Sequence, residues 1–268
     1  EIPDEASRGR TLLRMGTVYE RIGDQNKALT CFQESLQILK EFGGTPVEIS
    51  NALNSMGNIL RNSSDFEQAL IFYDQSLLLR MSAGDELLVA NTKNNIGAAL
   101  SATNEVDDAI AFAAEALKVK TEKLGPDSVE TGKALVNMGQ LHLSKKDHFV
   151  AERFFQEGLK VFRRQQGKAH PDVAVCMYNI GIIKEAMSDD VSARDHYRES
   201  IYIFKNGDDA GSNATLAFSL HNLSLLYLRQ REFEVALEYM REAYEIKLQA
   251  LGSESPETAS SQHWLGTL

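Results

Sequence analysis

The chain has 268 residues, 43% of them hydrophobic, and a formal net charge of −10 at neutral pH. This acidic balance excludes a general nucleic-acid-binding surface, and no run of about eighteen apolar residues predicts a membrane-spanning helix. The two cysteines, Cys31 and Cys176, and the lack of a secretory signal pattern lead us to expect a reducing, cytoplasmic setting. Because the chain begins without methionine, we expect it to be part of a longer protein.

One motif recurs along the chain with a period of about 42 residues. Each copy has a small residue that follows a large apolar one, and the first six copies have an alanine twelve residues later. The small residues are Gly16, Gly57, Gly97, Gly139, Gly181, Ser224 and Gly266, and the alanines are Ala28, Ala69, Ala109, Ala151, Ala193 and Ala236. A fixed period of this length predicts a solenoid of structural repeats.

The residues that follow each alanine predict a helix. In the second copy Ala69 is followed by Tyr73, Ser76 and Leu77, four, seven and eight residues later. These offsets lie on one face of a helix with 3.6 residues per turn. Small residues let two helices cross closely, and large neighbours fill the grooves. Each repeat is therefore predicted to be two antiparallel helices, helix A with the small residue and helix B with the alanine. In the third copy Ala113 replaces the aromatic residue, so helix B there should lie closer or pack less well.

The predicted helix starts carry capping signals. Thr45-Pro46-Val47-Glu48 has the pattern of a capping box with proline at the first helical position. Prolines at 126, 171 and 256 mark three further starts of helix A. An acidic residue suited to the N-terminus of helix B stands eight residues after each small residue, at Asp24, Asp65, Glu105, Asp147, Asp189 and Glu232.

These signals predict one array over residues 1–268, preceded by a polar lead-in at 1–9. The six repeats cover 10–43, 46–82, 86–124, 127–166, 171–206 and 215–251, and residues 256–268 form helix A of a seventh.

The pattern resembles the tetratricopeptide repeat (TPR). Its long period, with NNIG at 94–97, YNIG at 178–181 and the linker LGPDSVET, is similar to the repeats of kinesin light chains. HEAT and armadillo repeats have similar periods but lack this glycine-to-alanine spacing. The resemblance implies an all-α, right-handed α-solenoid or superhelix, with a concave wall lined by helix A residues.

Sequence signals for catalysis are absent. The histidines and cysteines show no metal-site spacing, and there is no P-loop, GxGxxG or GxSxG motif. We therefore expect no enzyme activity, no cofactor and no metal.

In this family, helix A residues at fixed distances from the small residue line the concave wall. The corresponding residues of the first three repeats predict a polar peptide-binding groove. Its residues are Arg21, Asn51, Asn54, Asn58, Arg61, Asn62, Asn91 and Asn94. Each asparagine amide offers a donor and an acceptor, which match the N–H and C=O of an extended peptide. The alternatives are a solvated groove or hydrogen bonding between repeats. Asn95, Asn137, Asn179 and Asn222 lie beside the packing seam and are expected to be structural.

The same offsets in the last three repeats predict a more apolar groove. Its residues are Lys133, Tyr178, Ile182, Phe218, His221 and Leu225. These groups could seat the hydrophobic anchors of a ligand. The alternative is that they pack against a further C-terminal helix or close the superhelix on itself.

The charge of the predicted groove favours a neutral or mildly acidic peptide. Over all repeats the inward set holds five cations, Arg10, Arg21, Arg61, Lys133 and Arg229, against two acids, Glu20 and Glu185. The cation that a chaperone-type dicarboxylate clamp requires is missing from its positions.

These features predict a non-catalytic scaffold or adaptor that binds an extended segment of a protein partner, with no nucleic acid and no membrane insertion. One alternative is the regulatory or sensor arm of a larger enzyme or signalling protein, with the groove occupied in cis by a domain outside this chain. Another is self-assembly through Trp264 and the open last helix. We expect alanine at Asn54 and Asn94 to weaken partner binding and leave the melting temperature nearly unchanged.

Overall fold

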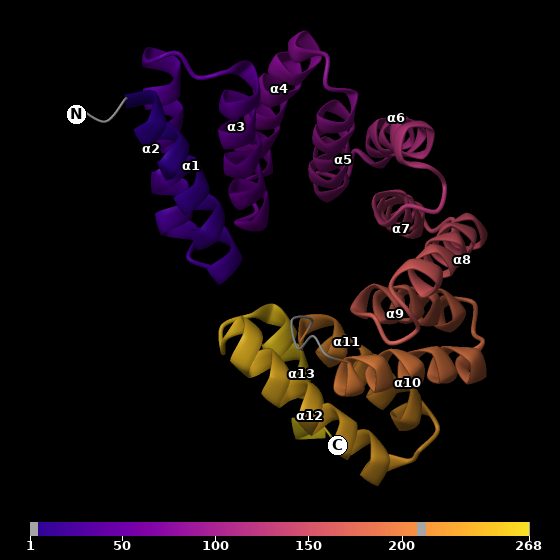
Figure 1. Cartoon of the computed structure of the whole chain (residues 1–268). Helices are drawn as coiled ribbons and strands as arrows, with labels where there is room; N and C mark the ends of the chain where they lie inside the picture. Colours follow the sequence, from indigo (N-terminus) through magenta and orange to yellow (C-terminus); the bar gives the residue numbers. More distant parts are fainter. Residues whose placement is uncertain (1–4, 208–212, 268) are drawn as a thin grey trace. The chain divides into compact units, whose positions relative to one another are not determined.

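The chain folds as paired helices. A computed structural model describes residues 5–207 and 213–267, and all regular secondary structure in these residues is α-helical (Figure 1). Contacts divide the chain into two compact units, with the boundary between Pro126 and Asp127. The prediction of an all-α array of helix pairs is confirmed.

The first unit contains three helix pairs. They are α1 (Glu5–Ile22) with α2 (Gln25–Glu41), α3 (Pro46–Asn62) with α4 (Phe66–Ala83), and α5 (Glu86–Ala102) with α6 (Val106–Leu124). Helix α1 begins at Glu5, within the predicted polar lead-in at 1–9. Ala6 and Gly9 are buried, so this first turn is part of the packed repeat. Gly9 packs against α2, where its carbonyl accepts a 2.7 Å hydrogen bond from Ser35 Oγ.

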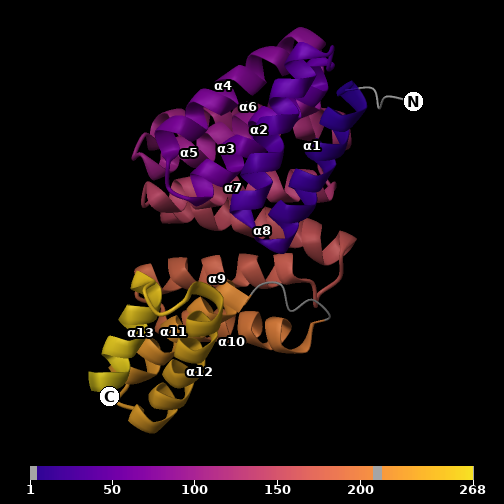
Figure 2. The same cartoon turned by 90° about the vertical axis from the view of Figure 1, so that its left-hand side faces the viewer.

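The second unit contains three pairs and a further helix. They are α7 (Val129–Ser144) with α8 (His148–Gln165), α9 (Pro171–Ala186) with α10 (Asp190–Asn206), α11 (Asn213–Arg229) with α12 (Phe233–Leu251), and α13 (Pro256–Thr267). Helix α13 corresponds to the predicted helix A of a seventh repeat. In this unit α11, α12 and α13 lie alongside one another (Figure 2).

Within each unit the A helices contact one another. Helix α3 touches α1 and α5 in the first unit, and α9 touches α7 and α11 in the second. Each B helix packs against the A helix of its own pair, and each one except α6 packs also against the next A helix of its unit. The A helices therefore form a continuous layer in each unit, which carries the predicted groove residues.

The small residues of the frame sit where the two helices of a pair cross. A Cβ added at Gly57 would lie 2.6 Å from the ring of Tyr73, and one at Gly181 would lie 2.6 Å from the ring of Tyr197. At Gly97 the nearest atom to an added Cβ is the backbone oxygen of Ala109, at 2.9 Å. In that third pair, where alanine replaces the aromatic residue, a Cβ on α5 would meet the backbone of α6.

The capping signals are only partly realised. Thr45 and Glu48 form the complete capping box, with Pro46 in the first turn. Asp24, Asp65 and Asp189 cap their helices, whereas Glu105, Asp147 and Glu232 make no side-chain cap bond. Proline 126 is not in the first turn of a helix, because Ser128 caps α7 and accepts a bond from the Thr131 amide.

Candidate functional site

A buried arginine lies behind the predicted asparagine groove of the first unit. Arg80, near the end of α4, is only 4% exposed. Its Nη2 donates to Asn51 Oδ1 at 2.8 Å, and its Nη1 donates to Asn54 Oδ1 at 3.4 Å. Because a guanidinium can only donate, both amide oxygens must turn towards Arg80.

The same guanidinium joins repeat 2 to repeat 3. Its Nε donates to Ser50 Oγ at 3.3 Å, and its Nη1 donates to Thr92 Oγ1 at 2.7 Å and to the Leu88 carbonyl at 3.1 Å. Burial lowers the pKa of Arg80 to about 10, so the group stays protonated at neutral pH. Arg80 therefore fixes the positions of side chains on α3 and of the start of α5.

A polar pocket opens in front of this arginine. It has a volume of about 340 Å³ and is lined by Leu13, Arg14, Thr17, Asn51, Asn54, Ser55 and Arg80. Asn51 and Asn54 are among the predicted groove residues on α3, whereas Arg80 comes from a B helix. The pocket lies wholly within the first unit.

A second polar cluster lies further along the same face. The Tyr73 hydroxyl donates to Asn58 Oδ1 at 2.8 Å. Burial raises the pKa of Glu20, while Arg21, Arg61 and a hydrogen bond from Asn58 act in the opposite direction. Asn58 is thus engaged by a tyrosine of its own repeat and an acid of the preceding one.

The other predicted asparagines have different surroundings. Asn62 and Asn91 are exposed, and Asn62 Oδ1 lies 3.5 Å from Arg61 Nη2. The Asn94 amide oxygen is buried and accepts no hydrogen bond within the described residues. Asn95 Nδ2 donates to Asn54 Oδ1 at 3.2 Å, which ties α5 to α3. Hydrogen bonding between repeats, one of the alternatives that the sequence left open, is therefore what Asn54 does in this structure.

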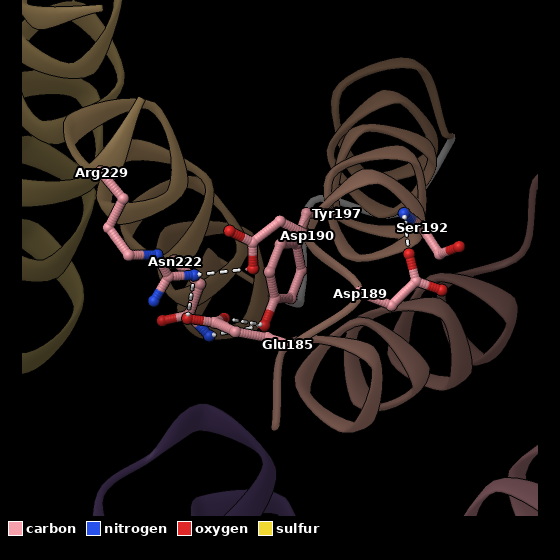
Figure 3. A network of polar contacts seen from close by, with 7 residues as sticks. All are labelled: Glu185, Asp189, Asp190, Ser192, Tyr197, Asn222 and Arg229. Atoms are coloured by element: carbon pink, nitrogen blue, oxygen red, sulfur yellow. Dashed lines mark hydrogen bonds and ion pairs between the residues drawn. The ribbon is translucent and has the colours of Figure 1, made fainter. Parts of the chain in front are cut away.

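The second unit has its own polar network, on α9, α10 and α11 (Figure 3). The Tyr197 hydroxyl donates to Glu185 Oε2 at 2.9 Å and accepts from Asn222 Nδ2 at 3.3 Å. Arg229 Nη2 lies 3.0 Å from Glu185 Oε1 and 3.3 Å from Asp190 Oδ1. Arg229, one of the predicted groove cations, is thus largely neutralised by its own unit. Burial raises the pKa of Tyr197, so its hydroxyl remains a donor.

Most of the predicted apolar groove residues of this unit serve packing. Tyr178 and Ile182 lie against the hydrophobic core, and Phe218 lies under the Lys247 ammonium, 5.1 Å from ring centre to Nζ. Leu225 is half-buried and Lys133 is exposed. These contacts place Tyr178, Ile182 and Phe218 in the packing of their own unit, and a role of this groove in ligand binding stays a prediction.

His221 is buried against the last helix. It is 9% exposed, and its Nδ1 lies 3.0 Å from Ser261 Oγ on α13. Lys247 Nζ donates to the same Ser261 oxygen at 2.9 Å. Burial lowers the pKa of His221 to about 4 and that of Lys247 to about 8. The contact between α11 and α13 therefore depends on a neutral imidazole.

Acidification is expected to weaken the packing of α13. The folded chain keeps His221 neutral down to about pH 4, whereas the unfolded chain takes up this proton near pH 6.5. The unfolded state therefore gains the proton first, and stability falls as the pH falls through this window. Fluorescence of Trp264, the single tryptophan and part of α13, should show a lower melting temperature at pH 5 than at pH 7. His221→Gln should reduce that difference, and an equal difference in both proteins would contradict the assignment.

Arg80 and Lys247 were not among the residues predicted for the groove. Their position in the repeat nevertheless indicates that they are unusual. Both stand eleven residues after the frame alanine of their repeat, where Leu39, Phe162 and Phe204 are buried in other repeats. Lys120 stands at this position in repeat 3 and is buried as well. A cation at a position that is otherwise apolar should reach a polar site with its end group.

The described residues contain no cluster of three or more candidate metal ligands. Nor does any helix among them combine the length and apolar character that crossing a bilayer requires.

Curated relatives match a large part of this chain but a small part of their own length. The Clustered mitochondria protein homolog of Emericella nidulans is 24% identical over 213 residues, which are 79% of this chain and 17% of that protein. This chain therefore spans only a small part of the length of the curated relatives it matches.

Solved structures share the fold at low sequence identity. A Podosopora anserina putative kinesin light chain with nearly identical TPR-like repeats has a TM-score of 0.61 and 10% identity, covering 76% of this chain and 99% of that one. A Rap protein complexed with Competence and Sporulation Factor has a TM-score of 0.70 and 13% identity, covering 96% of this chain and 73% of that one.

Family models agree with the repeat frame. One tetratricopeptide repeat model matches residues 48–122 and 130–206, which together are more than half of the chain. Two further tetratricopeptide repeat models match residues 10–38 and 217–257. The matched segments follow the helix pairs in both units. The chain belongs to the tetratricopeptide repeat family.

Proposed function

We propose that this chain is a non-catalytic protein-interaction module that holds an extended segment of a partner along the A helices of its first unit. The observation that carries the proposal is the polar pocket between α1 and α3. Because Arg80 engages the oxygens of Asn51 and Asn54, each amide keeps its Nδ2 group for another acceptor. Among the described residues neither Nδ2 donates to a protein oxygen, so both can donate to acceptor groups of a ligand.

The comparisons support an interaction role. One similar structure is of a Rap protein complexed with Competence and Sporulation Factor, so the fold can hold a partner. The absence of motifs for nucleotide, metal or covalent chemistry agrees with a non-catalytic role. Two free thiols suit a cytoplasmic setting.

The length of the curated relatives favours a second candidate. The matched residues are only 17% of the Emericella nidulans protein, so the segment held by the pocket could belong to the same polypeptide. The module would then be the regulatory arm of a larger protein. Synthetic peptides that tile the whole protein distinguish the two candidates, because only the second predicts that one of them binds.

Peptide selection tests the main proposal. Twelve-residue peptides from a random display library are selected on the immobilised chain, and affinities are measured by fluorescence anisotropy. Asn94→Ala should weaken binding about tenfold, as expected for one lost hydrogen bond to a ligand. It should leave the melting temperature unchanged, because the Asn94 amide oxygen has no partner in the described residues.

For Asn54 the structure changes the expectation from sequence that alanine leaves the melting temperature nearly unchanged. Asn54→Ala removes an acceptor of both Arg80 and Asn95, so it should lower the melting temperature as well as the affinity. Gln75→Ala, at an exposed position on α4, is the matched control and should change neither. Failure to select any peptide, or equal binding by the wild type and the Asn54→Ala variant, would refute the proposed function.

A further inference from the structure

The polar groups in front of Arg80 are mainly hydrogen-bond donors. Asn51 and Asn54 offer amide Nδ2 groups, since their oxygens face Arg80. Arg80 Nη2 uses one hydrogen for Asn51, and no second acceptor for it is recorded within the described residues. Arg14 and the Thr17 and Ser55 hydroxyls complete the polar lining. No carboxylate of the described residues lines the pocket.

The positive charge at this pocket is not balanced by a contacting acid. All five hydrogen bonds of Arg80 go to neutral oxygens: two hydroxyls, two amides and one carbonyl. Within the described residues neither Arg80 nor Arg14 forms an ion pair. Asp85 is the acid that acts on Arg80 through space, but its carboxylate caps α5 by accepting from the Leu88 amide. A buried cation without an anion is costly, so an anion that enters the pocket gains by compensating it.

We propose that this pocket is the subsite for one carboxylate side chain, aspartate or glutamate, of the bound segment. The inference rests on the proposed function and adds to it the chemistry that sets the register of the ligand. The carboxylate accepts from Arg80 Nη2 and from the two asparagine amides, with Arg14 at the rim. Hydrogen bonds to a carboxylate from a charged donor are about twice as strong as neutral ones.

The corresponding cation in the second unit shows why the subsite belongs to repeat 2. Lys247 occupies the same frame position as Arg80, and Ser261 the same position as Thr92. Where repeat 2 has Asn51, however, repeat 6 has Phe218, whose ring covers the Lys247 ammonium. The charge is therefore shielded in repeat 6 and open to a ligand in repeat 2.

This comparison supplies the test variant. Asn51→Phe copies the arrangement of repeat 6, so its ring should cover the Arg80 guanidinium and fill the pocket. Arg14→Ala removes only an exposed rim charge and should fold normally. Lys118→Gln, at an exposed position on α6, controls for the loss of one positive charge. Circular dichroism and melting temperatures establish that each variant is folded.

The experiment compares twelve-residue peptides selected from a random display library on the wild type and on each variant. Peptides selected on the wild type should share aspartate or glutamate at one position, and those selected on Asn51→Phe should not. The best wild-type peptide is then synthesised with glutamate, glutamine or phosphoserine at that position. Replacing glutamate by glutamine should weaken binding to the wild type about tenfold, and to Asn51→Phe less than twofold. Arg14→Ala should weaken the glutamate peptide several-fold, and Lys118→Gln should not.

The possible outcomes distinguish failure of the carboxylate subsite from failure of the proposed function. Selected peptides without a preferred acid would overturn the carboxylate subsite and leave the interaction role standing. Tighter binding of phosphoserine than of glutamate by tenfold or more would overturn it in favour of a phosphate site. If no peptide is selected at all, both proposals fail.

Discussion

Arg80→Leu is expected to destabilise the first unit by about 3 kcal/mol, more than any other single substitution proposed for this chain. The change removes five hydrogen bonds, among them those to Ser50 and Thr92 in the interior. Each buried polar group left without its partner costs about 1–3 kcal/mol, while loss of the buried charge offsets part of this. Urea denaturation followed by circular dichroism measures the free energy of unfolding.

A double-mutant cycle shows whether the effect runs through the joint between repeats 2 and 3. Thr92→Val removes the hydroxyl that Arg80 contacts at 2.7 Å. The double variant should be more stable than the sum of the two single changes implies, by about 1–2 kcal/mol. Lys118→Leu, at an exposed position, should change stability by less than about 0.5 kcal/mol. An Arg80→Leu protein as stable as the wild type would show that the guanidinium does not hold this joint.

Gly97→Ala is expected to destabilise the first unit by about 2 kcal/mol. Alanine in a helix interior is favoured over glycine by about 1 kcal/mol, so helix propensity alone predicts a gain. The added Cβ, however, would lie 2.9 Å from the backbone oxygen of Ala109. A backbone atom cannot rotate away as a side chain can, so α5 and α6 must separate, and such overpacking typically costs about 1–3 kcal/mol or more.

Gly266→Ala is the matched control for Gly97→Ala. Gly266 occupies the same position of the repeat frame, on α13, but no atom of the described residues lies within 4 Å of a Cβ added there. The substitution should therefore be neutral or stabilising by up to about 1 kcal/mol. Urea titrations of both variants measure the contrast. Equal effects at the two positions would mean that helix crossing does not explain the glycines of the frame.

The fold was predictable because its determinants are local. Gly57 and Tyr73 meet across one short turn, and their spacing recurs in the other repeats. The pattern of small, alanine and aromatic residues therefore specifies both helices and the face on which they cross. Most helix starts were predictable too, because Asp24, Asp65 and Asp189 cap their helices and Thr45 forms a full capping box with Glu48. The prolines at 171 and 256 begin their helices as predicted, whereas Pro126 does not, because Ser128 is the N-cap of α7.

The candidate site was less predictable, because long side chains reach across repeats. Asn51 and Asn54 were placed correctly on a helix A face, but the groups that engage them could not be read from helical offsets. Arg80 approaches from α4 with an extended side chain, and Arg229 reaches back to Glu185 on α9. Periodicity indicates the direction of a Cβ. The position of the charged group at the end of a long side chain depends instead on which neighbour offers a hydrogen-bond acceptor. The role of the asparagines in ligand binding stays a prediction.

The joints between neighbouring repeats also restrict the order in which the repeats can stand. Arg80 needs the hydroxyl of Thr92 in the following helix A, and Lys247 needs that of Ser261. Leu39, at the same position of repeat 1, is followed instead by Ala52. Exchanging two such repeats would leave a cation facing a methyl group and a leucine facing a hydroxyl. Although every repeat has the same backbone plan, the junctions differ in chemistry, so duplication or deletion of a repeat should be tolerated only where both sides of the new junction match.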